Sequence, residues 1–249
     1  MNQWISDNTR GKIKDLMDRL DDPENTACIL ANALYFKGSW KTKFDKAKTK
    51  MAPFYNFNGS ERNVEMMYGG KAKFKYLENG RFVCLSMPYG NGSFSFDILY
   101  PSMMPSSDVP ENTINDAEEW LKSNTIPIPS EFKSDAVVNM PKFKIETKFD
   151  GTGILSQMGI TRIFNLFLAD FSKMCESQCY VSKVLQGCNI AVDEAGAEAA
   201  AATVVTVVEL SAVSPVDSVS EFTIDHPFIY MIRENSTGAI LFMGKMVKM

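Results

Sequence analysis

Hydrophobic and polar residues alternate with a period of two over much of the chain, a pattern typical of half-buried β-strands. Phe94, Phe96 and Ile98 alternate with polar residues, and Asn91-Gly92 predicts a tight hairpin just before them. Other strands are predicted at residues 26–36, 83–88, 137–145, 180–192, 228–231 and 239–243. The run at 26–36 is almost continuously apolar, which predicts a strand covered on both faces.

Helices are predicted in fewer places. Residues 2–20 form a helix in two pieces, because apolar residues recur with helical spacing at Ile13, Leu16, Met17 and Leu20. A short helix is predicted from Thr113 to Leu121, with a capping box at its start. A third is predicted after Asp150, which would cap it, and ends at Gly159. Residues 101–112 are rich in proline and serine and are predicted to form a loop.

The segment around residues 194–211 carries two conflicting preferences. Its first half is rich in alanine and favours a helix, whereas residues 203–208 are β-branched and favour a strand. As a strand, it has one face without charge, made by Ala197, Ala199, Ala201, Thr203, Val205 and Val207. Glu198 falls on the opposite face, so the uncharged face could enter a sheet without burying an ion. An alanine-rich helix that leads into an edge strand remains the alternative on local pattern alone.

Composition allows a substantial core and excludes several kinds of protein. The chain has 249 residues, of which 45% are hydrophobic, and a net charge of −4 with no basic block, so nucleic acid is an unfavourable partner. No apolar run approaches the ~18–20 residues that cross a bilayer, and the first residues lack the features of a signal peptide. Five scattered cysteines indicate neither a disulfide scaffold nor a zinc site. Cys28, Cys84 and Cys188 are predicted to be small core residues.

Catalytic motifs are absent from the sequence. The only histidine, His226, is followed by Pro227, and no Gly-x-Ser-x-Gly elbow, Walker loop or dinucleotide fingerprint occurs. We therefore expect no catalytic residue, no metal and no cofactor, and the chain is predicted not to be an enzyme.

Several stretches, in the same order, resemble the serpin family. Glu194-Ala-Gly-Ala-Glu-Ala-Ala-Ala-Ala-Thr203 resembles the hinge of the serpin reactive centre loop. Met140-Pro-Lys-Phe-Lys-Ile-Glu-Thr-Lys-Phe149 resembles a strand of the second half of the family fold. The family's C-terminal signature is matched by Phe222-Thr-Ile-Asp-His-Pro-Phe228 with Gly238-Ala-Ile-Leu-Phe-Met-Gly244. Asn32-Ala-Leu-Tyr-Phe-Lys-Gly-Ser-Trp40 resembles the strand beside which the loop inserts, with Trp40 at the top of the sheet.

This resemblance implies an α+β fold with mixed and antiparallel sheets, a few helices and an exposed reactive centre loop. Residues 1–249 would form a single partial serpin domain with the loop at about 194–221, lacking roughly the first third of the family fold. Without that third, apolar faces would be partly uncovered. The implied hinge consists of Glu194, Gly196, Ala197, Glu198, Ala199, Ala200, Ala201 and Ala202. Gln186 stands where many serpins have histidine, which puts that hydrogen-bond network in question.

The implied function is inhibition of a serine protease, which cleaves the loop and is trapped when the loop inserts into the main sheet. Counting Glu194 as the first of seventeen residues predicts a reactive bond between Leu210 and Ser211. Leucine suits a chymotrypsin-like or elastase-like protease with an apolar pocket. The bond could instead lie toward Ala212 or Val213, and Glu209 would suit an acid-preferring protease.

Other implied properties concern partners and compartment. Neither nucleic acid nor a membrane is expected as a partner. Self-association is expected, in which the loop of one copy pairs with a sheet of another. The compartment is extracellular or cytoplasmic, and the family favours the extracellular space. The alternative function is a non-inhibitory binding or structural protein, or an inactive remnant, because a third of the fold is missing.

Overall fold

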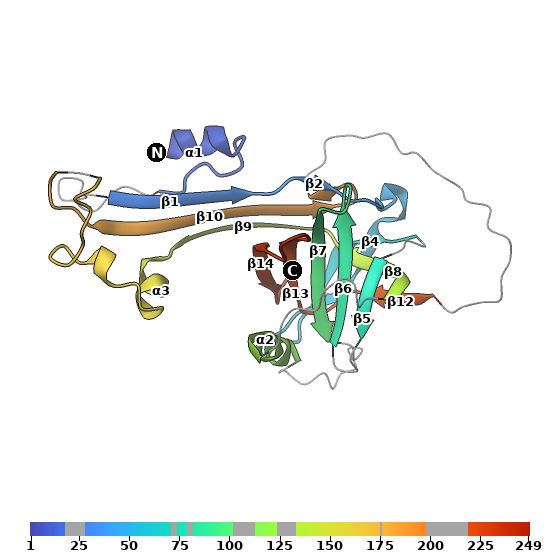
Figure 1. Cartoon of the computed structure of the whole chain (residues 1–249). Coiled ribbons are helices and arrows are strands. Elements are labelled where there is room, and N and C mark those ends of the chain that lie inside the picture. Colours follow the sequence, from blue (N-terminus) through green and yellow to red (C-terminus); the bar gives the residue numbers. More distant parts are fainter. Residues whose placement is uncertain are drawn as a thin grey trace. The chain divides into compact units, whose positions relative to one another are not determined.

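The computed structural model describes residues 1–17, 28–70, 74–78, 82–101, 113–123, 133–174, 176–197 and 219–249. These residues form two compact units (Figure 1). The first unit joins Met1–Phe36 to Lys144–Ala191, and the second joins Lys37–Phe143 to Val192–Met249. The predicted single-domain organisation stays a prediction.

The first unit contains a sheet with β10 at its centre. Its elements are α1 (Asn2–Asn8), β1 (Cys28–Tyr35), β9 (Phe143–Asp150), α3 (Thr152–Gln157), the 3-10 turn η3 (Arg162–Phe164) and β10 (Val181–Asp193). The first residue of β9 and the last two residues of β10 belong to the second unit. β1 pairs with β10 in parallel, from Cys28 opposite Val181 to Tyr35 opposite Asn189. β9 also pairs with β10, so that β10 lies between the two strands (Figure 1).

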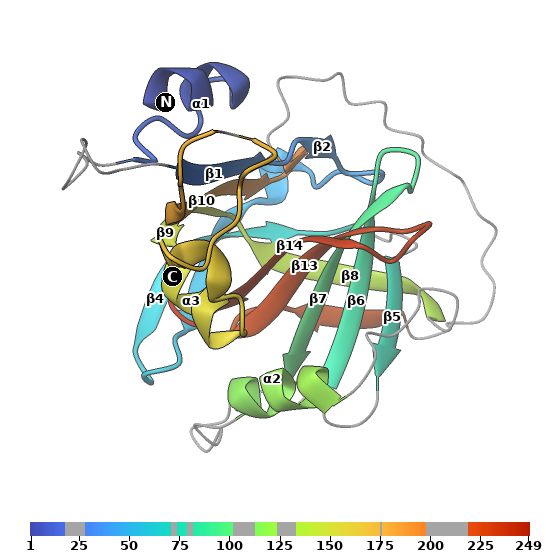
Figure 2. The same cartoon turned by 60° about the vertical axis from the view of Figure 1, so that its left-hand side comes forward.

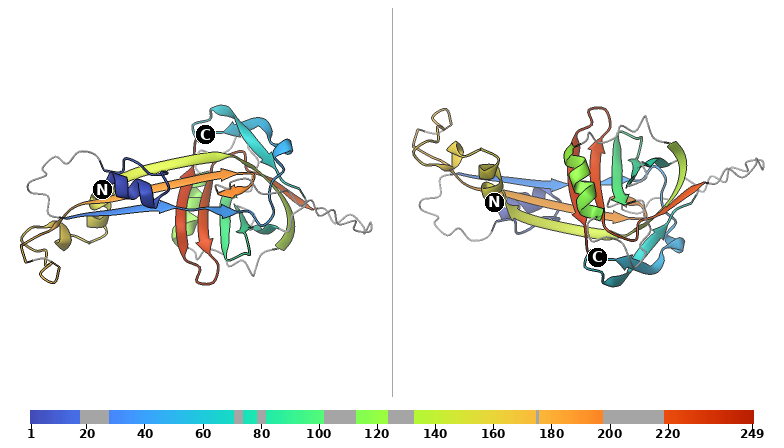
Figure 3. Two further views of the ribbon diagram at one scale, coloured as in Figure 1. Left: turned by 90° about the horizontal axis from the view of Figure 1, so that it is seen from above. Right: turned by 90° about the horizontal axis from the view of Figure 1, so that it is seen from below.

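One face of this sheet is covered by the N-terminal segment, as the view from above shows (Figure 3). Ile5, Ile13 and Leu16 of this segment are buried against Leu185 of β10. Three partly buried residues of β1 pack against the same cluster: Ile29, Ala31 and Ala33. The approach is close at Gly187, where an added Cβ would lie 3.0 Å from Leu16 Cδ1. The first piece of the predicted helix exists as α1, and Ile13 and Leu16 of the predicted stripe are buried, whereas Met17 is only partly buried and these residues are not helical. α1 ends at Asn8 because Arg10 and Gly11 take positive φ angles of 54° and 74°. Leu20 lies outside the described residues.

The prediction that the strand at 26–36 is covered on both faces was wrong. Leu30 of β1 is 47% exposed and its neighbour Asn32 is also exposed, so the face opposite α1 is open to solvent in the described structure. Cys28 and Cys188 are accordingly only partly buried rather than core residues, whereas Cys84 of the second unit is buried.

In the second unit, the described residues form a nine-stranded sheet in the order β14-β13-β7-β6-β5-β8-β4-β3, with β12 paired to β8. The strands are β3 (Lys50–Tyr55), β4 (Glu61–Tyr68), β5 (Phe74–Glu78), β6 (Phe82–Tyr89), β7 (Phe94–Pro101), β8 (Lys133–Pro141), β12 (Ser220–Thr223), β13 (Phe228–Glu234) and β14 (Ile240–Met246). The unit also holds β2 (Gly38–Ser39), the 3-10 turn η1 (Lys46–Lys48), α2 (Thr113–Ser123) and β11 (Gly196–Ala197). The predicted hairpin at Asn91-Gly92 joins β6 to β7, and Gly92 has the positive φ of 93° that such a turn needs.

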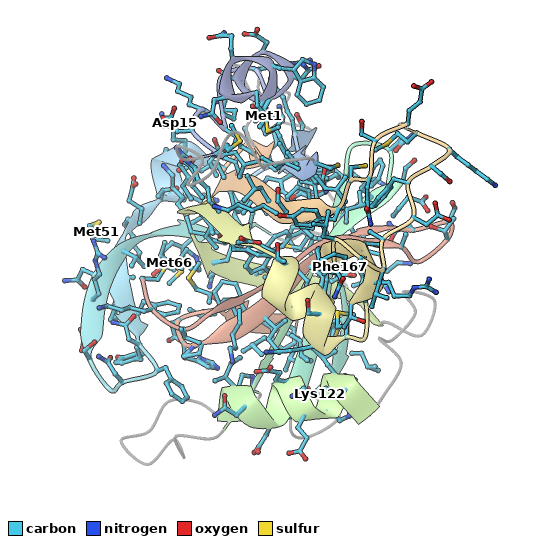
Figure 4. The ribbon with its side chains drawn as sticks, turned by 90° about the vertical axis from the view of Figure 1, so that its left-hand side faces the viewer. Met1, Asp15, Met51, Met66, Lys122 and Phe167 are labelled. Atoms are coloured by element: carbon cyan, nitrogen blue, oxygen red, sulfur yellow. The ribbon has the colours of Figure 1, made fainter. Side chains whose placement is uncertain are left out.

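The two faces of this sheet have different cores. On one face, aromatic rings pack together within 6.3 Å, and these belong to Phe96, Phe143, Phe228 and Tyr230. On the other face, α2 packs against Phe82, Cys84, Leu99 and Ile229 (Figure 2). At the edge, Met51 of β3 is 61% exposed, whereas Met66 of β4 is fully buried (Figure 4).

Two predicted strands differ from the structure. Residues 137–145 form two strands rather than one, because β8 ends at Pro141, which lacks an N–H, and β9 begins at Phe143. The predicted strand at 239–243 exists as β14 but is not buried, since Ile240 and Met243 are 42% and 53% exposed. The predicted helix after Asp150 exists as α3. Its N-cap is Gly151, while the Asp150 carboxylate accepts from the Thr152 N–H at 2.9 Å.

Candidate functional site

The chain reverses direction immediately after β10, at the start of the predicted loop hinge. Glu194 and Ala195 form a two-residue turn between β10 and β11, and Val192 lies opposite Ala197 in antiparallel register. The Asp193 carboxylate accepts from the N–H groups of Ala195 and Gly196, at 2.8 and 3.1 Å. This bonding is that of an Asx turn, so the aspartate before the hinge determines the turn.

Gly196 is required at this turn for two independent reasons. Its φ of 139° disfavours any residue with a side chain. An added Cβ would also collide with the Gly38 carbonyl oxygen and lie 2.7 Å from Ser39 Cα, because β11 pairs with β2 on its other side. Ala197, the next hinge residue, is completely buried. The predicted hinge thus begins as a short strand between the end of β10 and β2.

Trp40 contacts this turn through its backbone and its side chain, while its place at the top of the insertion sheet stays a prediction. Its backbone N–H donates to the Ala195 carbonyl at 2.9 Å, and its indole Nε1–H donates to the Asp193 carbonyl at 2.8 Å. The indole is buried and stacks on Tyr89, with ring centroids 4.4 Å apart. A rigid aromatic platform therefore satisfies two carbonyl groups of the hinge turn.

Glu194 is bound through both its backbone and its carboxylate. Phe44 N–H donates to the Glu194 carbonyl at 3.0 Å, and the Thr49 hydroxyl donates to the carboxylate at 2.7 Å. Lys142 Nζ lies 3.4 Å from the same carboxylate and 3.4 Å from that of Glu65. Sequence reasoning missed Thr49, Lys142 and Glu65, and no local signal could have identified them, because these contacts join distant parts of the chain.

The electrostatic balance favours the ionised form of both partners. Burial raises the pKa of Glu194, but the hydrogen bond from Thr49, the backbone N–H of Glu194 itself and the charge of Lys142 outweigh it, so the pKa lies below its ordinary value. Burial lowers the pKa of Lys142, but the carboxylates of Glu194 and Glu65 outweigh it and leave the pKa raised. The carboxylate and the ammonium therefore stabilise each other across the turn.

Comparison with known proteins identifies the family of the chain. A family model described as "Serpin (serine protease inhibitor)" matches residues 1–249. The chain belongs to the serpin family. It is 33% identical to Serpin B11 of Homo sapiens, over 99% of this chain and 62% of that protein. It is also 33% identical to the leukocyte elastase inhibitor of Equus caballus, over 98% of this chain and 64% of that protein. The crystal structure of Serpin48 from the insect Tenebrio molitor matches with a TM-score of 0.84 and 29% identity, covering 100% of this chain and 64% of the other.

The fold is therefore serpin-like, as the sequence motifs predicted. The chain spans less than two thirds of the length of these relatives.

Gln186 occupies its predicted place in the centre of the first unit's sheet. Asn32 Nδ2 of β1 donates to Gln186 Oε1 at 3.0 Å, across the parallel pairing of β1 with β10. Gln186 Nε2 in turn donates to the Gly187 carbonyl at 3.3 Å and approaches Cys188 Sγ at 3.3 Å. The network that was in question in this serpin is therefore made by two amide side chains.

The remaining site residues fall outside the described structure. These are the hinge residues Glu198, Ala199, Ala200, Ala201 and Ala202, and the predicted reactive bond Leu210–Ser211. The placement of the bond stays a prediction, as do Ala212, Val213 and Glu209 as alternatives.

The histidine His226 and the cysteine Cys84 are both buried. His226 is buried between the Asp225 carboxylate, 2.8 Å from Nδ1, and the Pro101 carbonyl, 3.2 Å from Nε2. Burial raises the pKa of the Cys84 thiol to about 12, which suppresses the reactive thiolate. Among the described residues, no cluster of three or more His, Cys, Asp or Glu side chains could hold a metal ion. Within the same ranges no helix is long and apolar enough to cross a membrane.

Proposed function

We propose that the protein inhibits serine proteases through a cleavable loop that follows β11 and inserts between β1 and β10 after cleavage. The observation that carries this proposal is the direct parallel pairing of β1 with β10, with no strand between them. β11 already pairs in antiparallel register with the end of β10. This is the arrangement expected before insertion, with the first residues of the new strand in register.

The change in strand pairing favours insertion. A loop strand that continued from β11 would run antiparallel to β10 and to its parallel neighbour β1. Insertion would thus replace one parallel ladder by two antiparallel ladders, which are slightly more stable per residue pair. The face of residues 197–207 that bears no charge meets the second requirement, because a buried ion without a partner would oppose insertion.

The register also agrees with the length of β10. Val192 lies opposite Ala197, so continued pairing would place Thr203 opposite Gln186 and Val208 opposite Val181, the first residue of β10. The bond Leu210–Ser211 would then lie just beyond the end of the strand. A protease attached at Leu210 would be carried along the full length of β10, which supports the predicted bond.

The target is proposed to be a protease with an apolar primary pocket. Relatives of this chain are named as leukocyte elastase inhibitors, and Leu210 fits such a pocket. We assign the protein to the extracellular space on the family resemblance. Secretion would be contradicted if all of the native protein were recovered from the cell fraction.

A second candidate is a non-inhibitory serpin-like protein, favoured by the exposure of Leu30. Side chains of an inserted strand at Thr203 would lie on the face of Gln186, the face that is open at Leu30 and Asn32. If this face stays open to solvent, an inserted strand buries less apolar surface, and insertion gains less free energy.

Incubation with chymotrypsin, elastase and trypsin separates the two candidates. An inhibitor gives a complex with chymotrypsin or elastase that survives a denaturing gel, together with loss of protease activity. Cleavage of the loop without such a complex would contradict inhibition and support the second candidate. Trypsin is the control, because no lysine or arginine occurs between Glu194 and Glu221.

A further inference from the structure

A pocket lies in the first unit, where the N-terminal segment meets β9 and β10. Its volume is about 380 Å³, at the small end of the range for ligand sites. It is lined by residues 15–17, by residues 148–150 of β9, and by Lys183 and Leu185 of β10. All of these residues belong to the first unit, so three segments that are distant in sequence form one site.

One wall of the pocket is apolar and preformed. Leu16 and Leu185 are 6% and 8% exposed and belong to the buried cluster beneath α1, and Met17 packs against the same cluster. The backbone of Met17 is held on both sides by Asn2, whose side chain donates to the Met17 carbonyl at 2.7 Å and accepts from the Met17 N–H at 2.9 Å. A ligand would therefore not have to order this wall on binding.

Asp150, one of the charged residues of the pocket, is already engaged within the protein. Its carboxylate accepts from the Thr152 N–H at 2.9 Å and from the Thr152 hydroxyl at 2.5 Å. Burial raises the pKa of Asp150, but the bonds from Thr152, the backbone N–H of Val184 and the charge of Lys183 outweigh it, so the pKa lies below its ordinary value. The charges of Asp150 and Lys183 thus offset each other at the start of α3.

The other charged pair, Asp15 and Lys148, has capacity left for a ligand. Lys148 Nζ donates to the Asp15 backbone carbonyl at 2.8 Å and not to the Asp15 carboxylate. An ammonium has three N–H donors, so this bond leaves others for a ligand. In the ranges that the structure describes, no hydrogen bond or ion pair engages the carboxylate of Asp15, an exposed residue labelled in Figure 4. The pocket therefore presents one positive and one negative group close together.

We propose that this pocket binds a small zwitterion with apolar side chains, of about the size of a dipeptide. The carboxylate of the ligand accepts from Lys148, and its ammonium donates to Asp15. Its apolar side chains cover Leu16, Met17 and Leu185 and leave water on binding. Both ends and the body of such a ligand thus find a matching surface.

Ligands of other charge fit the pocket less well. A simple anion would gain from Lys148 but would be repelled by the Asp15 carboxylate, and a simple cation would meet the reverse. A zwitterion without apolar side chains would leave the wall of Leu16 and Leu185 in contact with water. The combination of balanced charge and an apolar wall therefore favours a short apolar peptide.

The test measures binding of leucyl-leucine to the full 249-residue chain by isothermal titration calorimetry. Three related probes each lack one feature: N-acetyl-leucyl-leucine lacks the ammonium, leucyl-leucine amide lacks the carboxylate, and diglycine lacks apolar side chains. The test variants are Lys148→Gln and Asp15→Asn. The matched control variants, Lys144→Gln and Glu146→Gln, change exposed residues of the same strand β9 that do not line the pocket. Circular dichroism and thermal unfolding check that every variant folds like the parent.

We expect leucyl-leucine to bind the parent and both control variants within about twofold, and each test variant about tenfold or more weakly, because one charge-assisted hydrogen bond is lost. For the same reason, each related probe should bind the parent at least about tenfold more weakly than leucyl-leucine. Absence of saturable leucyl-leucine binding to the parent, or equal weakening of control and test variants, would overturn the site. Equal binding of N-acetyl-leucyl-leucine or of the amide would overturn the assignment to a zwitterion.

Discussion

Lys142 Nζ lies 3.4 Å from the carboxylate of Glu194, and this pair joins the residue between β8 and β9 to the turn that begins the predicted reactive loop. The two side chains are only 23% and 10% exposed, so salt screens the pair less than a surface ion pair. The Thr49 hydroxyl donates to the same carboxylate, so the position of Glu194 is held by both an ion pair and a hydrogen bond.

The Glu194→Gln variant should lose about 1–3 kcal/mol of unfolding free energy at neutral pH, because a charge-assisted bond is lost. The pKa of Glu194 is lowered in the folded state, so its contribution exists above the ordinary value of 4.5 and disappears as pH falls through the folded pKa. The pKa of Lys142 is raised, so the pair also persists as pH rises to the ordinary lysine value of 10.5. Urea unfolding at a series of pH values measures this dependence.

The control for this prediction is Glu61→Gln, since Glu61 is an exposed residue of β4 in the same unit. Its unfolding free energy should stay close to that of the parent at every pH. A Glu194→Gln variant whose difference from the parent does not shrink below pH 4.5 would contradict the proposed role of the ionised carboxylate.

Gly196→Ala should destabilise the second unit more than a glycine replacement at an open turn. Gly196 has both an unfavourable φ of 139° and backbone atoms in the way of a Cβ, so the cost should reach about 1–3 kcal/mol or more. Gly59→Ala is the matched control, because Gly59 has a φ of 78° but no atom within 4 Å of an added Cβ. Equal urea midpoints for the two variants would show that β11 does not pack against β2 in solution.

The sequence predicted features that depend on neighbouring residues. The hairpin at Asn91-Gly92 was confirmed, and the bounds of β10 were predicted to within one residue, because turn chemistry and apolar patterning act locally. The break between β8 and β9 was missed, although Pro141 is a local signal, because the apolar pattern continues across it. The partners of Glu194 could not be predicted, since only the folded sheet brings Thr49 and Lys142 to the turn.

The buried pair Asp97–Arg233 provides a test of packing in the second unit. Arg233 Nη2 lies 2.7 Å from Asp97, and Ser86 donates to the same carboxylate at 2.6 Å. Burial raises the pKa of Asp97 despite these partners, which shows how costly the site is for a charge. Asp97→Leu should cost about 3–5 kcal/mol because it leaves the buried guanidinium without its carboxylate.

Adding Arg233→Met to Asp97→Leu should recover most of that loss, because a buried ion pair and a well-packed apolar pair can be equally stable. Urea denaturation of the parent, both single variants and the double variant completes a double-mutant cycle. Additive losses in the double variant would mean that the two side chains do not interact.

The parity of the hinge predicts opposite effects at neighbouring alanines. In a form of the protein that traps protease, Ala199→Glu would place a charge on the uncharged face and cost several kcal/mol on insertion. Ala200→Glu is the matched control, because it lies on the face that already carries Glu198. The first variant should be cleaved without forming a complex, while the second keeps its yield on a denaturing gel. Equal yields would refute the parity argument.

Cleavage of the loop should produce a C-terminal peptide that begins at Ser211. Two arguments lead to this bond: the distance of seventeen residues from Glu194 to Leu210 and the register that brings Val208 to the first residue of β10. Mass spectrometry after chymotrypsin or elastase treatment reads the new N-terminus directly. A peptide that begins at Leu210 would indicate cleavage after Glu209, and one that begins beyond Ser214 would contradict the register. Leu210→Arg supplies the matched test, because it introduces the only basic residue between Glu194 and Glu221 and should make trypsin cut at this bond.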